Sequence, residues 1–572
     1  MKRINIYSQS LRNGFWAYTS GLILILSVAI CYVFSAISFF SGIGISAYTL
    51  PVSFVVACIM SGYKKTDVNL FLGVFVALFI WVICAYICTI LYDSSCDGNL
   101  YHMEIVANLY NGWNPYLYSS AIESNEFCAE HYAKAMETIG TCLMLITHRI
   151  QSSKAVTMVL AVGTLLILPT LLRRLSPQLS RKQSLLLALL VLSNPVVICQ
   201  MLRFYIDDIV YICVVLAVIS SLLISINERH KQVNYTLMAV AIVLAAGTKA
   251  NAMVYVAFVI ICTIVGMLMF NGSPRHVLHY LLFCALTCVI AISVICFHPY
   301  LTNWITDGHP LYPLMGENAV DIMSANTPEV CLTQNRLINL LYSIFSISRP
   351  SVDQRMGGFL PPFIILFPLS IAVIGYYAWR QKKFMPVVYV FICILISCLL
   401  FEQSWWARYI PQLWLLVPLS AYCLITTTQV KAKGIVTSII VVLGIATGML
   451  CCITTYLGAL RYTLRMDNLY EMASRRSLSI LVYQPQFVRM FEENHVKYIK
   501  SDTIVLTTEC PTCLSENVMV EPKIEKFLKE DEMAELDSML RLNNFYKFGA
   551  TVRRVIGKDE NIPFYNTTSA VD

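Results

Sequence analysis

The sequence predicts an all-α protein that crosses a membrane many times and ends in a small mixed domain. Of its 572 residues, 57% are hydrophobic and 13% are charged, whereas soluble proteins average about 25% charged residues. Apolar runs of about 17 to 24 residues recur along the chain, and each is long enough to cross a hydrocarbon core of about 30 Å. Because lipid satisfies no backbone hydrogen bonds, and no run alternates like a barrel strand, we expect these segments to be helices.

About thirteen segments have the length and composition of membrane spans. The expected spans are residues 16–40, 46–62, 68–92, 153–172, 184–200, 209–226, 233–248, 252–270, 277–297, 360–379, 384–401, 409–428 and 434–457. They divide the chain into an N-terminal transmembrane hairpin (1–67), a larger transmembrane domain (68–457) with two long loops (93–152 and 298–359), and a C-terminal domain (458–572).

Every second loop is short and basic, which sets the expected orientation. Loops that retain Lys and Arg stay on the cytoplasmic side. The N-terminus is therefore expected in the cytoplasm, and an odd number of spans puts the C-terminal domain and both long loops outside. The formal net charge of +7 then reports topology, and it is not the footprint of a nucleic-acid partner. The basic loops contain Lys2, Arg3, Arg12, Lys64, Lys65, Arg173, Arg174, Arg181, Lys182, Arg229, Lys231, Arg275, Arg380, Lys382, Lys383, Lys431 and Lys433.

The regions outside the spans carry their own secondary structure. In the first long loop, residues 101–110 and 133–150 place apolar side chains at helical spacing, which indicates helices lying on the membrane interface. The tail combines β-like runs at 478–483 and 503–507 with polar helical runs such as 524–540. We therefore expect an α/β or α+β domain on the outer side.

Most of the 21 cysteines lie in apolar spans, where Cys behaves as a small hydrophobic residue. Cys510 and Cys513 in the tail are the exception, because the expected topology puts them on the oxidising side. Without a second pair of ligands they favour a structural disulfide or free thiols over a zinc site.

Ionisable residues collect at the outer ends of the spans, in five separate loops. Charges at membrane depth are costly, so such residues often mark a pathway or a site. A cluster of carboxylates and cations suits a reaction that needs a base and also binds an anion. The candidates are Asp93, Asp97, His102, Glu104, Arg203, Asp207, Asp208, Lys249, His298, Glu402 and Arg408.

Each of these residues also has a purely structural interpretation. Asp207 and Asp208 fit a solvated turn, Lys249 and Arg408 fit side chains that snorkel to headgroup phosphates, and His298 before a proline fits a helix end. Tryptophans at the outer ends fit an interfacial belt as well as a stacking surface for a ligand. It is the collection of these residues at one side that favours a site.

Five short motifs lie in these loops. They are Asp97-Gly-Asn-Leu-Tyr-His102, Gly112-Trp-Asn-Pro-Tyr116, Thr248-Lys-Ala-Asn251, Gly308-His-Pro-Leu-Tyr-Pro-Leu314 and Ala407-Arg-Tyr-Ile-Pro411. These motifs resemble C-type (GT-C) glycosyltransferases, multispanning enzymes that take sugars from polyprenyl-phosphate carriers, and they occur in the family's order between about residues 68 and 430. The N-terminal hairpin is an addition to the family's arrangement, and the family's second acidic motif is recognisable only as Arg203-Phe-Tyr-Ile-Asp207-Asp208.

The resemblance implies an inverting transfer of a sugar from a polyprenyl-phosphate donor to a glycan, lipid or protein acceptor. It implies Asp97 as the general base, with Asp93 as the alternative, and His102 as a residue that orients the base or binds the acceptor. Arg203, Lys249 and Arg408 are then the candidates for binding the donor phosphate. Asp207, Asp208, Glu104, Glu402 and His298 are candidates for the acceptor or for a divalent cation, Mg²⁺ or Mn²⁺, whose requirement stays open. The motifs also resemble bacterial members, which implies a bacterial inner membrane.

Two other classes fit part of the same pattern. A lipid-linked polysaccharide ligase or polymerase shares the donor chemistry and differs in transferring a preassembled chain. A transporter or lipid flippase predicts ionisable groups near the membrane midplane and broken helices there, whereas here these groups lie at one rim.

Overall fold

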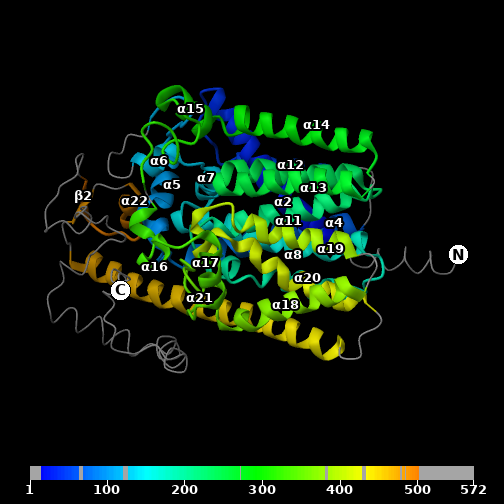
Figure 1. The fold of residues 1–572 in the computed structure, drawn as a ribbon. Coiled ribbons are helices and arrows are strands. Elements are labelled where there is room, and N and C mark those ends of the chain that lie inside the picture. Colours follow the sequence, from blue (N-terminus) through cyan, green and yellow to red (C-terminus); the bar gives the residue numbers. More distant parts are fainter. Residues whose placement is uncertain are drawn as a thin grey trace.

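A computed structural model describes residues 15–62, 68–119, 126–270, 272–321, 323–380, 384–427, 433–476, 480–482 and 485–500. Within them the chain forms an α-helical bundle with shorter helices gathered at one end (Figure 1). We call this end, where α5, α6, α7, α15, α16, α17 and α22 lie, the loop end.

Among the residues that the structure describes, eight helices are long and apolar enough to cross a membrane, which confirms a multi-pass membrane architecture. Most are apolar on all sides, as expected for helices surrounded by lipid or by other helices. They are contained in α2 (Phe15–Phe40), α4 (Val68–Ile90), η2 with α8 (Ile150–Lys154 and Ala155–Leu175), α11 (Asp207–Ser225), α13 (Ala250–Met269), α14 with η3 (Pro274–Ile290 and Ala291–Ile295), α18 (Pro361–Arg380) and α21 (Lys433–Arg476).

The remaining expected spans overlap shorter helices. One of them, 184–200, is interrupted, because α9 ends at Leu192 and α10 begins at Pro195 after the cap Asn194. Proline lacks an amide hydrogen and starts a helix more readily than it continues one. These shorter helices are α3 (Thr49–Gly62), α9 (Arg181–Leu192), α10 (Pro195–Gln200), α12 (Lys231–Thr248), α19 (Phe384–Ser397) and α20 (Leu416–Thr426).

Helix α11 forms the centre of the bundle and packs against α8, α12 and α13. Nearly all of its side chains are buried. At the crossing of α2 and α8, Gly21 and Gly163 let the two backbones approach closely: a Cβ on Gly21 would lie 2.5 Å from the carbonyl oxygen of Gly163. Small residues at such crossings are typical of membrane helices, which associate by close packing.

The loop end contains the non-spanning helices. The segments expected as interfacial helices form α5 (Met103–Tyr110) and α7 (Ala135–Thr147). The expectation that they lie flat on the membrane is wrong, because most of their side chains are buried and they pack against each other. The other elements here are η1 (Gly98–His102), α6 (Glu126–His131), α15 (Phe297–Asp307), η4 (Ser324–Asn326), α16 (Glu329–Leu332), α17 (Arg336–Phe345), η5 (Glu402–Trp405), η6 (Ala407–Tyr409) and η7 (Pro411–Leu415).

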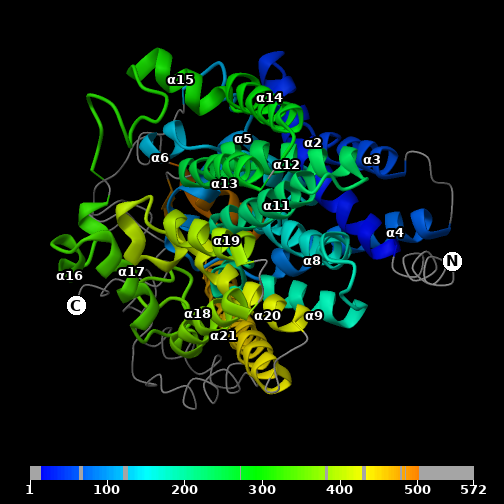
Figure 2. The same ribbon diagram turned by 45° about the vertical axis from the view of Figure 1, so that its right-hand side comes forward.

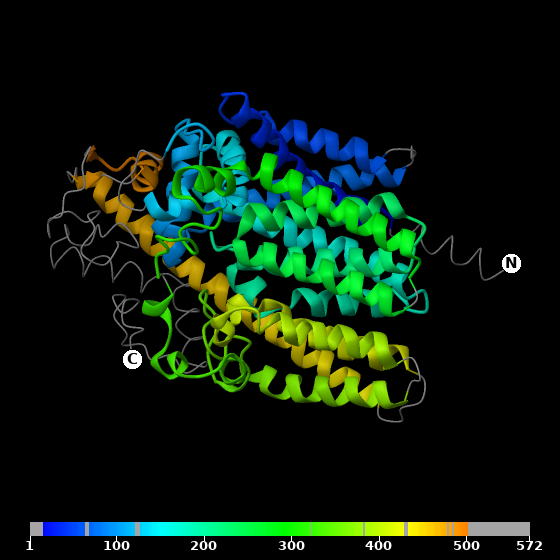
Figure 3. The same ribbon diagram turned by 45° about the horizontal axis from the view of Figure 1, so that its top comes forward.

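Helix α21 has 44 residues, which corresponds to about 66 Å at 1.5 Å per residue. It runs past its expected end at residue 457 and projects beyond the loop end of the bundle (Figure 3). After it, β1 (Ile480–Val482), α22 (Pro485–Glu493) and β2 (Tyr498–Lys500) form a parallel β-α-β unit, with Ile480 opposite Tyr498. The first expected tail strand is thereby confirmed in part, whereas residues 503–507 and 524–540, Cys510 and Cys513 lie outside the described residues.

Candidate active site

A tight loop after α4 presents Asp97 at the loop end. Asp93 lies fully buried beneath it and accepts hydrogen bonds from the amides of Ser95 and Phe204, at 2.8 and 2.9 Å. The loop closes so tightly on Asp93 that a Cβ on Gly98 would lie 2.1 Å from its Oδ2. A glycine is therefore required at residue 98, and the π-helical turn η1 follows directly after Asp97.

Asp97 belongs to an ion-pair network that we call the Arg408 cluster, made of Asp97, Asp207, Lys249, Asp353, Arg355 and Arg408. Nη1 of Arg408 lies 3.0 Å from Oδ2 of Asp97 and 3.5 Å from Oδ2 of Asp207. Nζ of Lys249 donates to Oδ1 of Asp207 at 2.7 Å. The loop after α4, the start of α11, the α12–α13 junction and η6 thus meet in one cluster.

The second long loop completes the Arg408 cluster. Oδ1 of Asp353 lies 3.1 Å from Nε of Arg408, and Oδ2 accepts a hydrogen bond from Nε of Arg355 at 2.6 Å. Trp406 lies between the two guanidinium groups, 4.4 Å from that of Arg408 and 5.1 Å from that of Arg355. Such stacking fixes the guanidinium planes and leaves their edges for anions.

The Arg408 cluster has a closed floor and an open side. The side chains of Arg408 and Asp207 are 7% and 1% exposed, whereas Asp97, Lys249 and Asp353 are 22%, 26% and 29% exposed. Solvent therefore reaches a carboxylate that is held by a buried arginine and an amine that is held by a buried aspartate.

Neighbouring carboxylates keep Arg408 and Lys249 positively charged. Burial alone would lower the pKa of Arg408, but Asp97, Asp207 and Asp353 together with Tyr205 raise it well above its usual value. Burial likewise works against the charge of Lys249, and Asp207 outweighs it, so the pKa of Lys249 is raised. Fixed positive charges of this kind stabilise an anion without reorganisation at the moment of reaction.

Of the two adjacent acidic residues, Asp207 is the one that belongs to the cluster. Asp208 is buried, and its Oδ1 accepts from the next amide in α11, that of Ile209, at 2.8 Å. Gln200 bridges the pair, since its Nε2 donates to Asp207 at 3.3 Å and its Oε1 accepts from the amide of Asp208 at 3.1 Å.

Asp93 and Arg203 form a second, closed ion pair behind the loop. Nη1 of Arg203 lies 3.5 Å from Asp93, and both side chains are at most 4% exposed. Nearby, Lys154 donates to Gln151 at 2.6 Å and to the carbonyl of Leu91. This pair holds the end of α4 against residues 203–204 and does not face solvent.

The other predicted site residues have their contacts outside the Arg408 cluster. His102 is buried and bonded to Glu137 of α7, and Glu104 is buried in α5. His298 contacts Nζ of Lys134 at 2.6 Å through Nε2. Glu402 is 78% exposed and pairs with Arg336 at 3.4 Å.

Lys134 and His298 are buried in contact with each other, where two positive charges would repel. Burial lowers the pKa of Lys134 to about 7. Burial and the neighbouring Lys134 hold the pKa of His298 well below its usual value. A neutral His298 that accepts at Nε2 and bonds Thr302 through Nδ1, at 2.9 Å, fits this arrangement.

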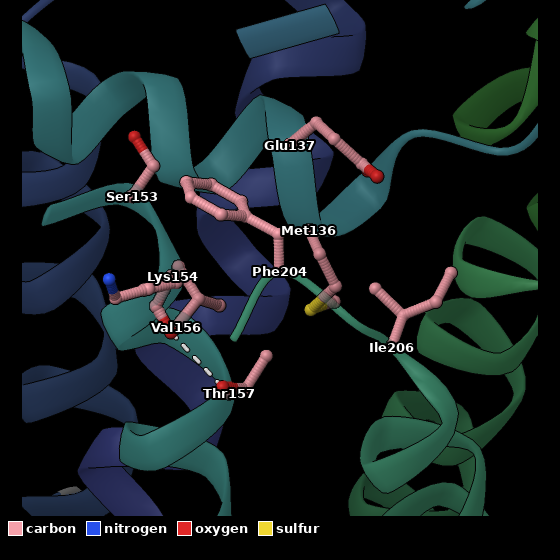
Figure 4. A pocket seen from close by; sticks show the side chains of 8 residues that line it. All are labelled: Met136, Glu137, Ser153, Lys154, Val156, Thr157, Phe204 and Ile206. Carbon is pink, nitrogen blue, oxygen red and sulfur yellow. Dashed lines mark hydrogen bonds between the residues drawn. The ribbon is translucent and has the colours of Figure 1, made fainter. Parts of the chain in front are cut away.

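A small cavity lies near the Asp93–Arg203 pair, lined by residues of α7, α8 and the 203–206 segment (Figure 4). Its volume of about 10 Å³ is at the lower limit for one water molecule. It therefore has no room for a ligand larger than water. Its lining side chains are Met136, Glu137, Ser153, Lys154, Val156, Thr157, Phe204 and Ile206.

No group of three or more His, Cys, Asp or Glu side chains is arranged to hold a metal ion in the part of the chain that the structure describes. The three carboxylates of the Arg408 cluster instead surround a guanidinium, at the position where a cation bound by them would lie.

The C-terminal unit supports the loop that carries Asp97. Nε2 of the fully buried Gln486 in α22 donates to the carbonyl of Asn99 at 3.2 Å. Asn99 in turn donates to the carbonyls of Asp93 and Ser95, at 3.1 and 2.8 Å. Glu493 accepts from the amide of Ile150 at 2.8 Å, which fixes α22 to the same region.

Sequence reasoning missed Asp353, Arg355, Gln200 and Gln486. Asp353-Gln-Arg355 precedes the glycine pair 357–358 and the proline-initiated helix α18. A charged pair immediately before a spanning helix was the available signal for the first two, whereas nothing local distinguishes the two glutamines.

The sequence was also compared with known proteins. No protein-family model matches the chain, and no curated protein matches it.

Proposed function

We propose that the chain is a membrane glycosyltransferase that moves a sugar from a polyprenyl-phosphate donor to an acceptor hydroxyl at the loop end. The observation that supports this most is the Arg408 cluster, in which a part-exposed carboxylate, Asp97, lies 3.0 Å from a buried guanidinium. A base and a fixed anion site side by side are what such a transfer requires.

In this proposal Asp97 removes the proton from the acceptor hydroxyl, and the acceptor oxygen attacks the anomeric carbon. The bond between that carbon and the phosphate oxygen breaks, and the phosphate leaves with the electron pair. The leaving group is already a stable anion, so it needs cationic stabilisation and no proton. Lys249 and Arg408 supply that charge, and attack opposite the phosphate inverts the anomeric centre.

The ion pairs suggest how donor binding would activate the base. Three carboxylates and three cations make the Arg408 cluster neutral as it stands. A donor phosphate that takes over the Arg408 contact would release Asp97 from its partner. An unpaired carboxylate is a stronger base, so deprotonation would be coupled to the presence of the donor.

We further propose that the loop end faces the periplasm of a bacterial inner membrane, with the N-terminus in the cytoplasm. Arg174, Arg181, Arg275 and Arg380 lie at helix ends opposite the loop end, at the last turn of α8 and α18 and the first turn of α9 and α14. Basic residues concentrated at one end are typical of the cytoplasmic side.

The test is transfer of radiolabelled sugar from a panel of polyprenyl-phosphate sugars to source-cell membranes. We expect the wild type to transfer one sugar residue and the Asp97→Asn variant to lose at least about 100-fold in rate. Transfer of a preassembled chain would make the protein a ligase or polymerase. If the wild type transfers nothing and moves labelled lipid across proteoliposomes, it is a flippase and the proposal fails.

A further inference from the structure

Two short helices of the second long loop bury polar side chains while large apolar side chains on their other side are exposed. In α15, Asn303 is buried, whereas the neighbouring Trp304 and Ile305 are 60% and 75% exposed. In water the opposite arrangement is expected, because exposed apolar surface is unfavourable.

Helix α17 also exposes large apolar side chains. Its buried side is mixed, with Asn339 and Ser343 beside Leu340 and Ile344, whereas Leu337, Leu341 and Phe345 are exposed. The exposed residues follow each other at intervals of four and therefore form a single stripe along the helix. A stripe of three large apolar side chains differs from scattered exposed leucines and marks a contact surface.

Hydrogen bonds fix both helices in this orientation. Nδ2 of Asn303 donates to the carbonyl of Tyr312 at 2.7 Å, and Nδ2 of Asn339 donates to that of Cys331 at 3.2 Å. Ser343 donates to the carbonyl of Trp405. Rotating either helix to bury its apolar stripe would break these bonds, so the outward apolar side is a built feature.

Both helices pack against segments that are long and apolar enough to cross a membrane. Helix α15 packs on η3, the last turn of a spanning segment, and Val294 in that turn is exposed. The ring of Phe345 at the end of α17 lies 6.3 Å from that of Phe367 in the spanning helix α18. The two helices lie beside α14 and α18, on different sides of the bundle (Figure 2).

We propose that α15 and α17 are in-plane membrane helices that embed their apolar stripes in the leaflet at the loop end. The occupant of these surfaces is lipid, with acyl chains against Ile305, Leu337 and Leu341 and the headgroup region around Trp304. Tryptophan prefers this boundary, and helices with one apolar side bind there by burying it.

This placement sets the depth of the Arg408 cluster. Ser404 donates to the carbonyl of Arg336 at 2.7 Å, and Ser343 bonds Trp405, so α17 is attached to the segment that carries Arg408. An embedded α17 holds that guanidinium at the level of the headgroups. The inference concerns membrane contact and does not depend on which reaction the cluster performs.

The test uses tryptophan fluorescence of the full chain in nanodiscs. The signal of Trp304 is the difference between the wild type, which has eight tryptophans, and the Trp304→Phe variant. A second probe, on α17, is a Leu341→Trp variant, and Glu492→Trp on the exposed side of α22 is the matched control. Each is measured with lipids brominated near the carbonyl end of the acyl chain and with aqueous iodide.

We expect brominated lipid to remove most of the Trp304 and Leu341→Trp signals and iodide to leave them nearly unchanged, with the reverse for the control. Quenching of either probe by iodide would show a helix exposed to water and would overturn the proposal. Protection from both quenchers would also overturn it, because a protein surface such as a second copy would then cover the stripe. The Trp304 difference keeps the test valid if Leu341→Trp fails to fold.

Discussion

The two ion pairs of the first long loop use the same residue types and differ in access. Asp93 and Arg203 are closed off, and every oxygen of Asp93 has a donor or cation beside it. Asp97 and Arg408 share one contact at 3.0 Å, and Asp97 keeps an exposed edge. A carboxylate whose bonds are all internal stabilises the loop, whereas one that is held by a single contact can exchange partners with a substrate.

The largest expected effect is a loss of protein stability when the closed ion pair is broken. Asp93→Asn removes a buried charge and leaves Arg203 without its counter-ion, which should cost about 3 to 5 kcal/mol in the free energy of unfolding. Equilibrium chemical unfolding of the purified protein in detergent measures it. Asp353→Asn is the control, because it removes a part-exposed carboxylate and should cost at most about 1 kcal/mol. Equal losses would mean that the closed pair is not structural.

Arg408→Lys should act on activity and much less on folding. A lysine keeps the positive charge but lacks the planar guanidinium group, whose several N–H donors can contact two or more anions at once. We therefore expect the rate of sugar transfer to fall about 100-fold. Arg203→Lys is the matched change in the closed pair and should leave the transfer rate of the folded fraction within a few fold. A larger fall for Arg203→Lys would reverse the roles assigned to the two arginines.

Removing the contact between the C-terminal unit and the Asp97 loop should have a smaller effect on the transfer rate. Gln486→Leu removes the hydrogen bond to Asn99, worth about 1 kcal/mol, and should lower kcat about fivefold with little change in KM. Glu492→Gln on the exposed side of the same helix is the control and should have no effect. A change in KM alone would place α22 in acceptor binding and not in support of the Asp97 loop.

A further effect concerns pH. Burial lowers the pKa of Lys134 from its ordinary value to about 7. Between that pH and about 10 the unfolded chain binds the proton more readily than the folded one, so stability rises with pH in this window. Lys134→Met removes this group, and its Tm should rise less over the same window than that of the wild type. An unchanged slope would show that Lys134 keeps its proton when folded.

These contrasts also separate what the sequence could predict from what it could not. Each expected span overlaps a helix of the structure, so the apolar runs located the helices. The positions of Asp97, Asp207, Lys249 and Arg408 near span ends predicted that these residues lie on the same side of the membrane. Which charges pair was not predictable, because Asp93 and Asp97 are equally polar in sequence. Their difference arises from the loop that closes on Asp93, and that closure depends on distant residues such as Phe204 and Gln486.

Tertiary packing also explains why other predicted site residues lie outside the Arg408 cluster. Glu402 occurs only six residues before Arg408, but its side chain lies at the surface. The chain turns between the two residues, because Glu402 begins η5 and Arg408 lies in the next short helix, η6. The helices α5 and α7 have the periodicity of interfacial helices, but other elements cover both sides of them. Periodicity shows that a helix has an apolar side, and only the tertiary structure shows what covers it.

In the proposed mechanism Asp97 acts as the base and the adjacent cations bind the donor phosphate. Donor binding and single-turnover transfer should be measured together for Asp97→Asn and Lys249→Gln. We expect Asp97→Asn to bind the polyprenyl-phosphate sugar at least as tightly as the wild type and to transfer it at least about 100-fold more slowly. We expect Lys249→Gln to bind the donor more weakly. Persistent transfer by Asp97→Asn, or equal loss of donor binding in both variants, would contradict this mechanism.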